Sequence, residues 1–67
     1  MKTRLMSDEN ALALIAELKS CGFFTADTDI PAGIAKFYIG TGIVFRAVRK
    51  GDAGQPWVVR ANPHLID

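Results

Sequence analysis

The spacing of apolar residues changes once along this chain, near residue 34, and that change limits the folds open to it. Before it, Ala11, Leu14, Ile15 and Leu18 recur at the spacing of an amphipathic α-helix. After it, the segments "IAKFYIG", "GIVFRAVRK" and "WVVRA" alternate between two sides, which is the period of a β-strand. The pattern therefore predicts one helix followed by strands.

The ends of the helix are marked by the residues that flank it. Ser7 is a good N-cap, and Asp8 and Glu9 place negative charge on the first turn, where backbone N–H groups are exposed. Gly22 can adopt the left-handed conformation that ends a helix. We expect a helix over about residues 8–21.

The strands are expected over about residues 34–39, 43–50 and 57–61, joined by the turns "GTG" and "GDAGQP". The intervening segment "FFTADTDIPAG" has the Thr, Asp, Pro and Gly content of a loop. The predicted fold is α+β, with one N-terminal amphipathic helix packed on a three-stranded antiparallel β-meander. We weigh one alternative, in which residues 31–38 form a second helix and the domain is a winged helix-turn-helix.

Length and composition bound the remaining choices. The 67 residues form a single small domain, and the 49% hydrophobic content is that of a folded chain. A lone Cys21 and a lone His64 offer neither an internal disulfide nor a zinc site, and no cofactor is expected. The longest apolar run, "ALALIA", is too short for a membrane span, so we expect a soluble, cytoplasmic protein without a membrane partner.

Charge is distributed unevenly although the net charge is only +1. Residues 1–33 carry a net charge of −2, and residues 34–61 carry +4. Bulk charge therefore does not make the chain a nucleic-acid binder, whereas the strand-rich part has a basic surface of its own.

One face of the predicted sheet is expected to be a binding surface. If Phe37, Phe45 and Trp57 pack on the helix, the opposite face combines cations, one tyrosine and valines, which is the composition of a protein interface. The expected partner-binding residues on this face are Lys36, Tyr38, Val44, Arg46, Val48, Lys50, Val58 and Arg60. A solvated face without any ligand explains the same composition, because long cationic side chains cover apolar neighbours with their stems.

Direct DNA or RNA binding is the alternative function. Lys and Arg pair with phosphates and a flat ring stacks on a base, whereas three valines contribute nothing to phosphate binding. The residues expected to bind nucleic acid in that case are Lys36, Arg46, Arg49, Lys50 and Arg60.

The sequence lacks a catalytic set, so no enzymatic activity is expected. His64 lies in a Pro-flanked tail with no Ser, Cys or carboxylate arrangement nearby that would support catalysis. Cys21 falls on the apolar stripe of the helix, where a small core residue is expected. We therefore expect an interaction protein that docks on a larger protein or nucleoprotein complex and inhibits or regulates it, in the manner of small phage or mobile-element inhibitors of host defence complexes. A structural subunit of an oligomer, such as a homodimer, is a further alternative.

Overall fold

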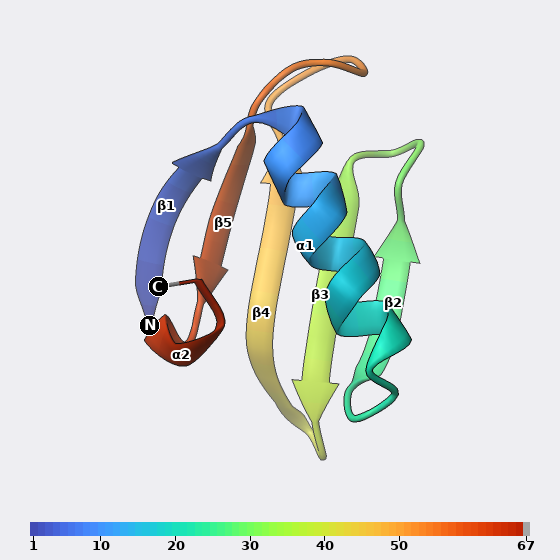
Figure 1. Ribbon diagram of the computed structural model, residues 1–67, viewed down its shortest axis with the longest axis vertical. Helices are drawn as coiled ribbons and strands as arrows, with labels where there is room; N and C mark the ends of the chain where they lie inside the picture. The colour runs from blue at the N-terminus through green and yellow to red at the C-terminus, as the bar shows by residue number, and fades with distance from the viewer. Residues whose placement is uncertain (67) are drawn as a thin grey trace.

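The computed structural model describes residues 1–66 and contains one antiparallel sheet with a helix after its first strand (Figure 1). The strands stand in the order β1-β5-β4-β3-β2, so the first strand of the chain lies beside the last one. The elements are β1 (Lys2–Met6), α1 (Asp8–Ser20), β2 (Thr25–Asp29), β3 (Ile34–Ile39), β4 (Gly42–Arg49), β5 (Trp57–Ala61) and α2 (Pro63–Ile66).

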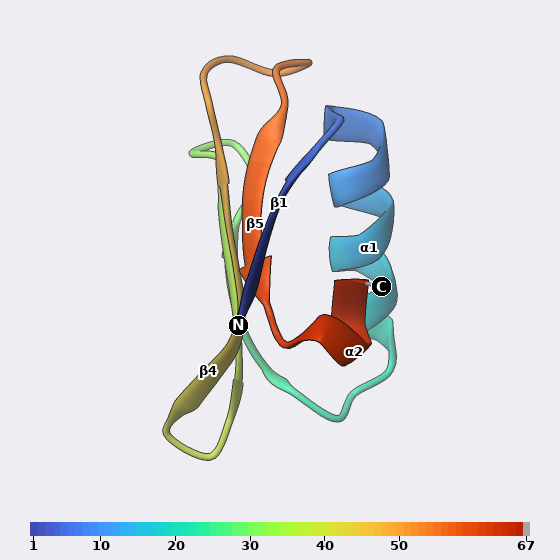
Figure 2. The same ribbon diagram turned by 90° about the vertical axis from the view of Figure 1, so that its left-hand side faces the viewer.

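The sheet is covered on one face only. α1 runs across that face, and the short α2 lies on the same side near the ends of β1 and β5 (Figures 1 and 2). Seen from the side, no helix within residues 1–66 lies on the opposite face (Figure 2). We call this uncovered side the open face.

α1 begins and ends at the residues that the sequence marks. The Ser7 hydroxyl accepts a hydrogen bond from the backbone N–H of Asn10 at 3.2 Å, which satisfies one of the N–H groups left free in the first turn. Gly22 follows the helix with a φ of +70°, a left-handed conformation that costs glycine little.

The core lies between α1 and the covered face of the sheet. Its largest fully buried side chains are Trp57, Phe37, Phe45 and Val59. Phe37 and Phe45 pack edge to face, with ring centroids 5.5 Å apart. The remaining buried apolar residues are mostly small or come from the helices, and they are Ala11, Ile15, Leu18, Ala35, Ala47, Ala61 and Ile66. Alanines beneath the helix allow its backbone to approach the sheet closely.

Asp8 ties the N-terminus of α1 to the sheet. Its carboxylate accepts hydrogen bonds from the indole N–H of Trp57 at 2.7 Å and from the backbone N–H of Gly54 at 3.2 Å. The guanidinium of Arg49 lies 5.6 Å from the centroid of the Trp57 ring. One carboxylate therefore holds α1, β5 and the loop before β5 together.

The prediction of a three-stranded meander with one helix is wrong, because β1 and β2 complete a five-stranded sheet and α2 follows β5. Both missed strands are edge strands with few apolar residues, "KTRLM" and "TADTD". Each is held by backbone pairing along one side, to β5 and to β3 respectively. Hydrophobic alternation does not detect such strands, since they bury little surface.

The winged helix-turn-helix alternative is also wrong. Residues 30–33 form a turn, closed by a hydrogen bond from the N–H of Gly33 to the carbonyl of Ile30 at 2.9 Å, and residues 34–39 form β3. Gly33 has a φ of +74°, which a helix does not accommodate.

Candidate functional site

The open face carries a row of aliphatic side chains that crosses four strands. Leu5 of β1 is opposite Val58 of β5, Val58 is opposite Val48 of β4, and Val48 is opposite Ile34 of β3. Residues directly opposite each other in antiparallel strands project to the same face. Leu5 is 62% exposed, Ile34 39% and Val48 38%. We call these four residues the aliphatic row.

A row of cations runs beside the aliphatic row. Each cation lies two residues from the aliphatic residue of the same strand. Arg60 of β5 is opposite Arg46 of β4, and Arg46 is opposite Lys36 of β3. Within residues 1–66, none of these three side chains forms a hydrogen bond or an ion pair. We call them the cation row. Like charges directly opposite each other in a sheet are destabilising, so the row costs free energy in the isolated chain.

Tyr38 flanks the cation row on its other side, where it is paired with Ile43 of β4 and Thr25 of β2. It is half-buried, and Ile43 is 40% exposed. Two carboxylates mark the β2 edge of the same face, since Asp27 is opposite Lys36 and Asp29 is opposite Ile34. The open face therefore carries three cations in its middle, a row of aliphatic side chains beside them, and two carboxylates at the β2 edge.

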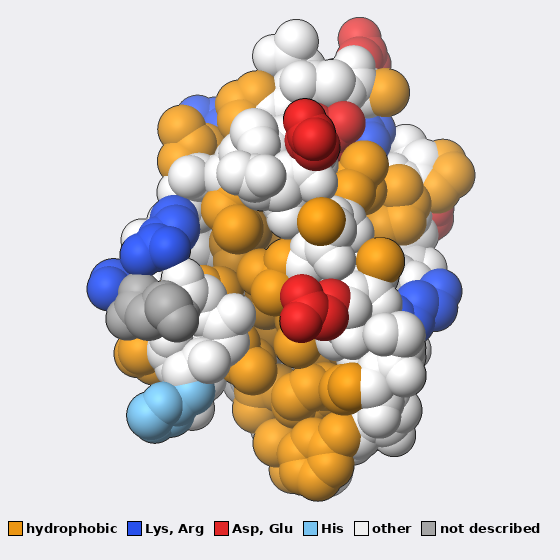
Figure 3. Space-filling model, in the orientation of Figure 1, with side chains coloured by type: hydrophobic (Ala, Val, Ile, Leu, Met, Phe, Trp, Pro, Cys, Tyr) orange, Lys and Arg blue, Asp and Glu red, His pale blue; other side chains and the backbone are white. Residues whose placement is uncertain are grey.

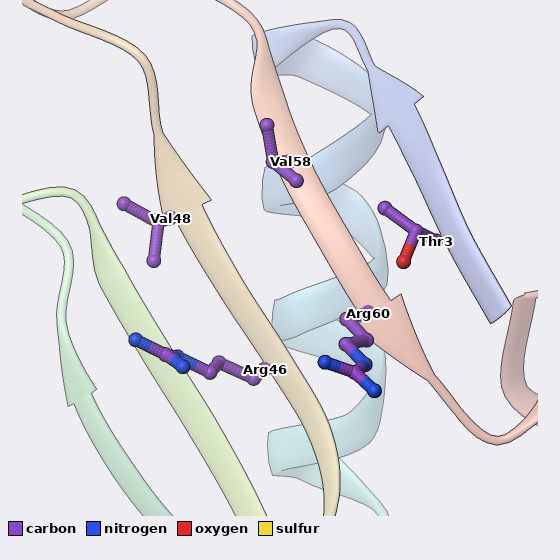
Figure 4. Close-up of a pocket in the computed structure, with 5 residues that line it drawn as sticks. All are labelled: Thr3, Arg46, Val48, Val58 and Arg60. Atoms are coloured by element: carbon purple, nitrogen blue, oxygen red, sulfur yellow. The ribbon is translucent and has the colours of Figure 1, made fainter. Parts of the chain in front are cut away.

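A shallow hollow of about 290 Å³ lies where the two rows meet (Figure 4). Figure 4 shows Arg46 and Val48 projecting from β4 and Val58 and Arg60 from β5, all on the side away from α1. Thr3 of β1 closes the hollow. With two valines on one side and two guanidinium groups on the other, the hollow suits an aliphatic group that carries a carboxylate.

Val44 was expected on this face, and the structure places it elsewhere. The pairing of β3 with β4 shifts between Phe37 and Tyr38, so that Phe37 is opposite Phe45 while Tyr38 is opposite Ile43. Val44 is the extra residue of this irregularity, packs against the core, and lines an apolar hollow of about 230 Å³ on the helix side. Strict alternation fails at a β-bulge, because one strand gains a residue that its partner lacks.

Arg49 and Lys50 also lie apart from the cation row. The guanidinium of Arg49 donates hydrogen bonds to the carbonyls of Gly51 (2.7 Å), Ile30 (3.2 Å) and Pro31 (3.1 Å), and its donors are thereby engaged in holding two loops. Lys50 is exposed beyond the end of β4, in the loop to β5. The predicted residues that share the open face are Lys36, Tyr38, Arg46, Val48, Val58 and Arg60.

Sequence reasoning missed the contributions of β1 and β2 to this face. Leu5, Thr3 and Asp27 reach it from strands that were not predicted. The threonines of "TADTD" were the only indication of β2, since β-branched residues favour strands. Ile34 was placed on the correct side by its alternation with Lys36 but was not counted among the binding residues.

The described residues hold no group of three or more metal-ligating side chains. Cys21, expected in the core, is exposed, and its thiol donates to the carbonyl of Leu18. His64 is exposed in α2 and lies at the rim of the hollow that contains Val44. Neither α1 nor α2 is both long and apolar enough to cross a membrane, within the part of the chain that the structure describes.

Comparison with known proteins gives no indication of function, so the function is inferred from the open face. No family model, no curated protein and no solved structure matches this chain.

Proposed function

We propose that this protein is a non-enzymatic docking protein, which uses its open face to bind a larger protein or nucleoprotein complex and to inhibit or regulate it. The cation row is the observation that carries the proposal. Arg60, Arg46 and Lys36 stand side by side without a hydrogen-bonded or ion-paired partner among residues 1–66, although their repulsion costs stability. Selection tolerates such a cost where function requires it, and an anionic partner would convert the repulsion into attraction.

The aliphatic row favours a protein surface as that partner. Burying four aliphatic side chains against an apolar surface lowers the free energy of binding, whereas a phosphate backbone has no apolar surface to bury them. Arginine and tyrosine beside such a row are the residues that most often dominate protein–protein binding. The partner surface is expected to present carboxylates next to apolar side chains.

Direct binding of single-stranded nucleic acid is the second candidate, favoured by Tyr38 next to the cation row. Asp27 and Asp29 oppose it, because a phosphate chain that follows the cation row toward β2 meets two carboxylates. Arg49, which holds the carbonyls of Ile30 and Pro31, adds no positive charge to the face.

Affinity capture from lysate of the source cells, with three forms of the protein, tests the proposal. The wild type is compared with Arg46→Glu and with Lys19→Glu, which makes the same change of charge on the helix side. We expect the same protein to be retained by the wild type and by Lys19→Glu and lost with Arg46→Glu. Equal retention by all three would remove the open face as the docking site.

Titration with labelled oligothymidine and oligouridine tests the second candidate. We expect little binding at low salt. Binding that falls steeply as salt rises and disappears with Arg46→Glu would replace the protein-docking proposal with nucleic-acid binding, since release of counterions makes phosphate contacts salt-dependent.

A further inference from the structure

We infer that the open face also receives the outer surface of α1 from a second copy of this chain, so that copies stack helix on sheet. This inference rests on the proposed function, because it takes the open face as a docking site and names one occupant. The evidence is that α1 presents the kind of surface that the open face requires, with carboxylates among apolar side chains.

The outer surface of α1 is apolar and acidic. Its exposed positions include Ala13 and Ala16 with Glu9 and Glu17, and the half-buried Leu12 flanks them. Positions 9, 13, 16 and 17 lie within an arc of about 100° on one side of the helix, because 9 and 13, 13 and 16, and 13 and 17 are three or four residues apart. Small side chains here allow a close approach by another surface.

Charge is arranged in opposite ways on the two faces. Carboxylates stand over α1 among apolar atoms while cations gather at the margins of that face (Figure 3). Lys19, the one cation of α1, points to the β2 edge, where its ammonium donates to the Thr28 hydroxyl at 3.4 Å. On the open face the cations occupy the middle, and Asp27 and Asp29 occupy the β2 edge.

The dimensions of the two charged groups agree. Glu9 and Glu17 are eight residues apart, which is about 12 Å along a helix. The cation row from Arg60 to Lys36 spans two strand spacings, about 10 Å. Glutamate and arginine side chains are long enough to take up the difference.

Symmetric pairings of two copies are disfavoured by the same charges. Two open faces placed together would bring one cation row against the other, and two α1 surfaces would bring Glu9 and Glu17 against their own copies. The helix-on-sheet arrangement instead places the carboxylates of α1 against the cation row of the open face. Such an interface is heterologous, so each copy retains one unused surface and further copies can add.

The area available makes the association weak. The molecule measures 30 × 21 Å across this face, a projected area of about 630 Å², and α1 covers only part of it. Stable interfaces bury about 800 Å² on each side. Stacking is therefore expected only at high protein concentration, and a partner with a larger matching surface would displace the second copy.

Sedimentation velocity over a concentration series tests the inference, from about 10 µM to about 1 mM, the range in which a weak interface of this size assembles. Wild type is compared with Arg46→Glu, with Glu17→Lys and with an equimolar mixture of these two variants. Asp52→Lys, in the loop between β4 and β5, repeats the charge change of Glu17→Lys away from both surfaces. Circular dichroism checks that each variant is folded, and Arg60→Glu replaces Arg46→Glu if the latter is not.

The wild type and Asp52→Lys are expected to associate as concentration rises, and each single variant to do so at least tenfold more weakly. The mixture is expected to recover association, because one variant keeps an intact open face and the other an intact α1 surface. A wild type that stays monomeric throughout, or a mixture no better than its components, would overturn the inference. Either result leaves the proposed function standing, since that function is decided by capture of a partner and not by self-association.

Discussion

At the scale of single residues, the turn before β3 depends on a contact between Gly33 and Arg49. The N–H of Arg49 donates to the carbonyl of Gly33 at 2.8 Å, and the guanidinium bridges the carbonyls of Ile30, Pro31 and Gly51. A Cβ built on Gly33 would lie 2.8 Å from the Cβ of Arg49. The position therefore requires glycine both for its positive φ and for lack of space.

Gly33→Ala is expected to lower the free energy of unfolding by about 2 to 3 kcal/mol, through backbone strain together with a steric clash. Gly40→Ala is the matched control, because Gly40 also has a positive φ, +60°, but no heavy atom lies within 4 Å of the added Cβ. The control should lose about 1 kcal/mol, from backbone strain alone. Urea denaturation of both variants measures the difference. Equal losses of unfolding free energy would mean that Arg49 moves away from the added Cβ without loss of stability.

Residue-level prediction from the sequence succeeded where strict alternation holds. Arg46, Val48, Val58 and Arg60 lie on one face as their spacing indicates. Val44 does not, because the shift in pairing near Phe37 turns it toward the helix side, and nothing in the local pattern of "GIVFRAVRK" records that shift. Arg49 lies opposite Trp57 on the covered side, as its alternation with Arg46 and Val48 indicates, and only its charge placed it among the predicted nucleic-acid-binding residues.

At the scale of elements, β1 and β2 decide the shape of the open face, and both carry charges suited to an edge. β2 presents Asp27 and Asp29, and β1 carries Lys2 and Arg4 on the side of the helix. Charges on an edge strand discourage a copy of the same strand from pairing with it. Because of these charges, hydrophobic alternation does not detect the two strands, whereas the more apolar β3, β4 and β5 begin and end within one residue of the ranges expected.

Native-state hydrogen exchange should separate the edge from the centre of the sheet. The hydrogen-bonded amides of the two edge strands, β1 and β2, are expected to exchange fastest among the strands, because each pairs with a single neighbour and most of its residues are exposed. Those of β5, which is paired on both sides and contains the buried Trp57 and Val59, should exchange most slowly. Equal protection of β2 and β5 would show that the sheet opens only as one unit.

At the scale of the whole molecule, the side chains that form the core lie on the opposite face of the sheet from the proposed docking surface. Packing of α1 on the covered face provides the core, with Trp57 tied to Asp8 at the start of the helix. The open face contributes no fully buried side chain and carries a row of cations that repel one another. We therefore propose that Arg46 serves binding and that its presence lowers the stability of the fold.

The free energy of unfolding of Arg46→Glu in low salt shows whether Arg46 stabilises or destabilises the fold, with Arg46→Gln as the neutral control. Glutamate between Arg60 and Lys36 replaces two repulsions by two attractions, so Arg46→Glu should be more stable than wild type by up to about 1 kcal/mol, and Arg46→Gln by less. The same Arg46→Glu variant should lose its partner in the capture experiment. A loss of more than about 1 kcal/mol would contradict the account, because it would mean that Arg46 serves the fold and not a partner.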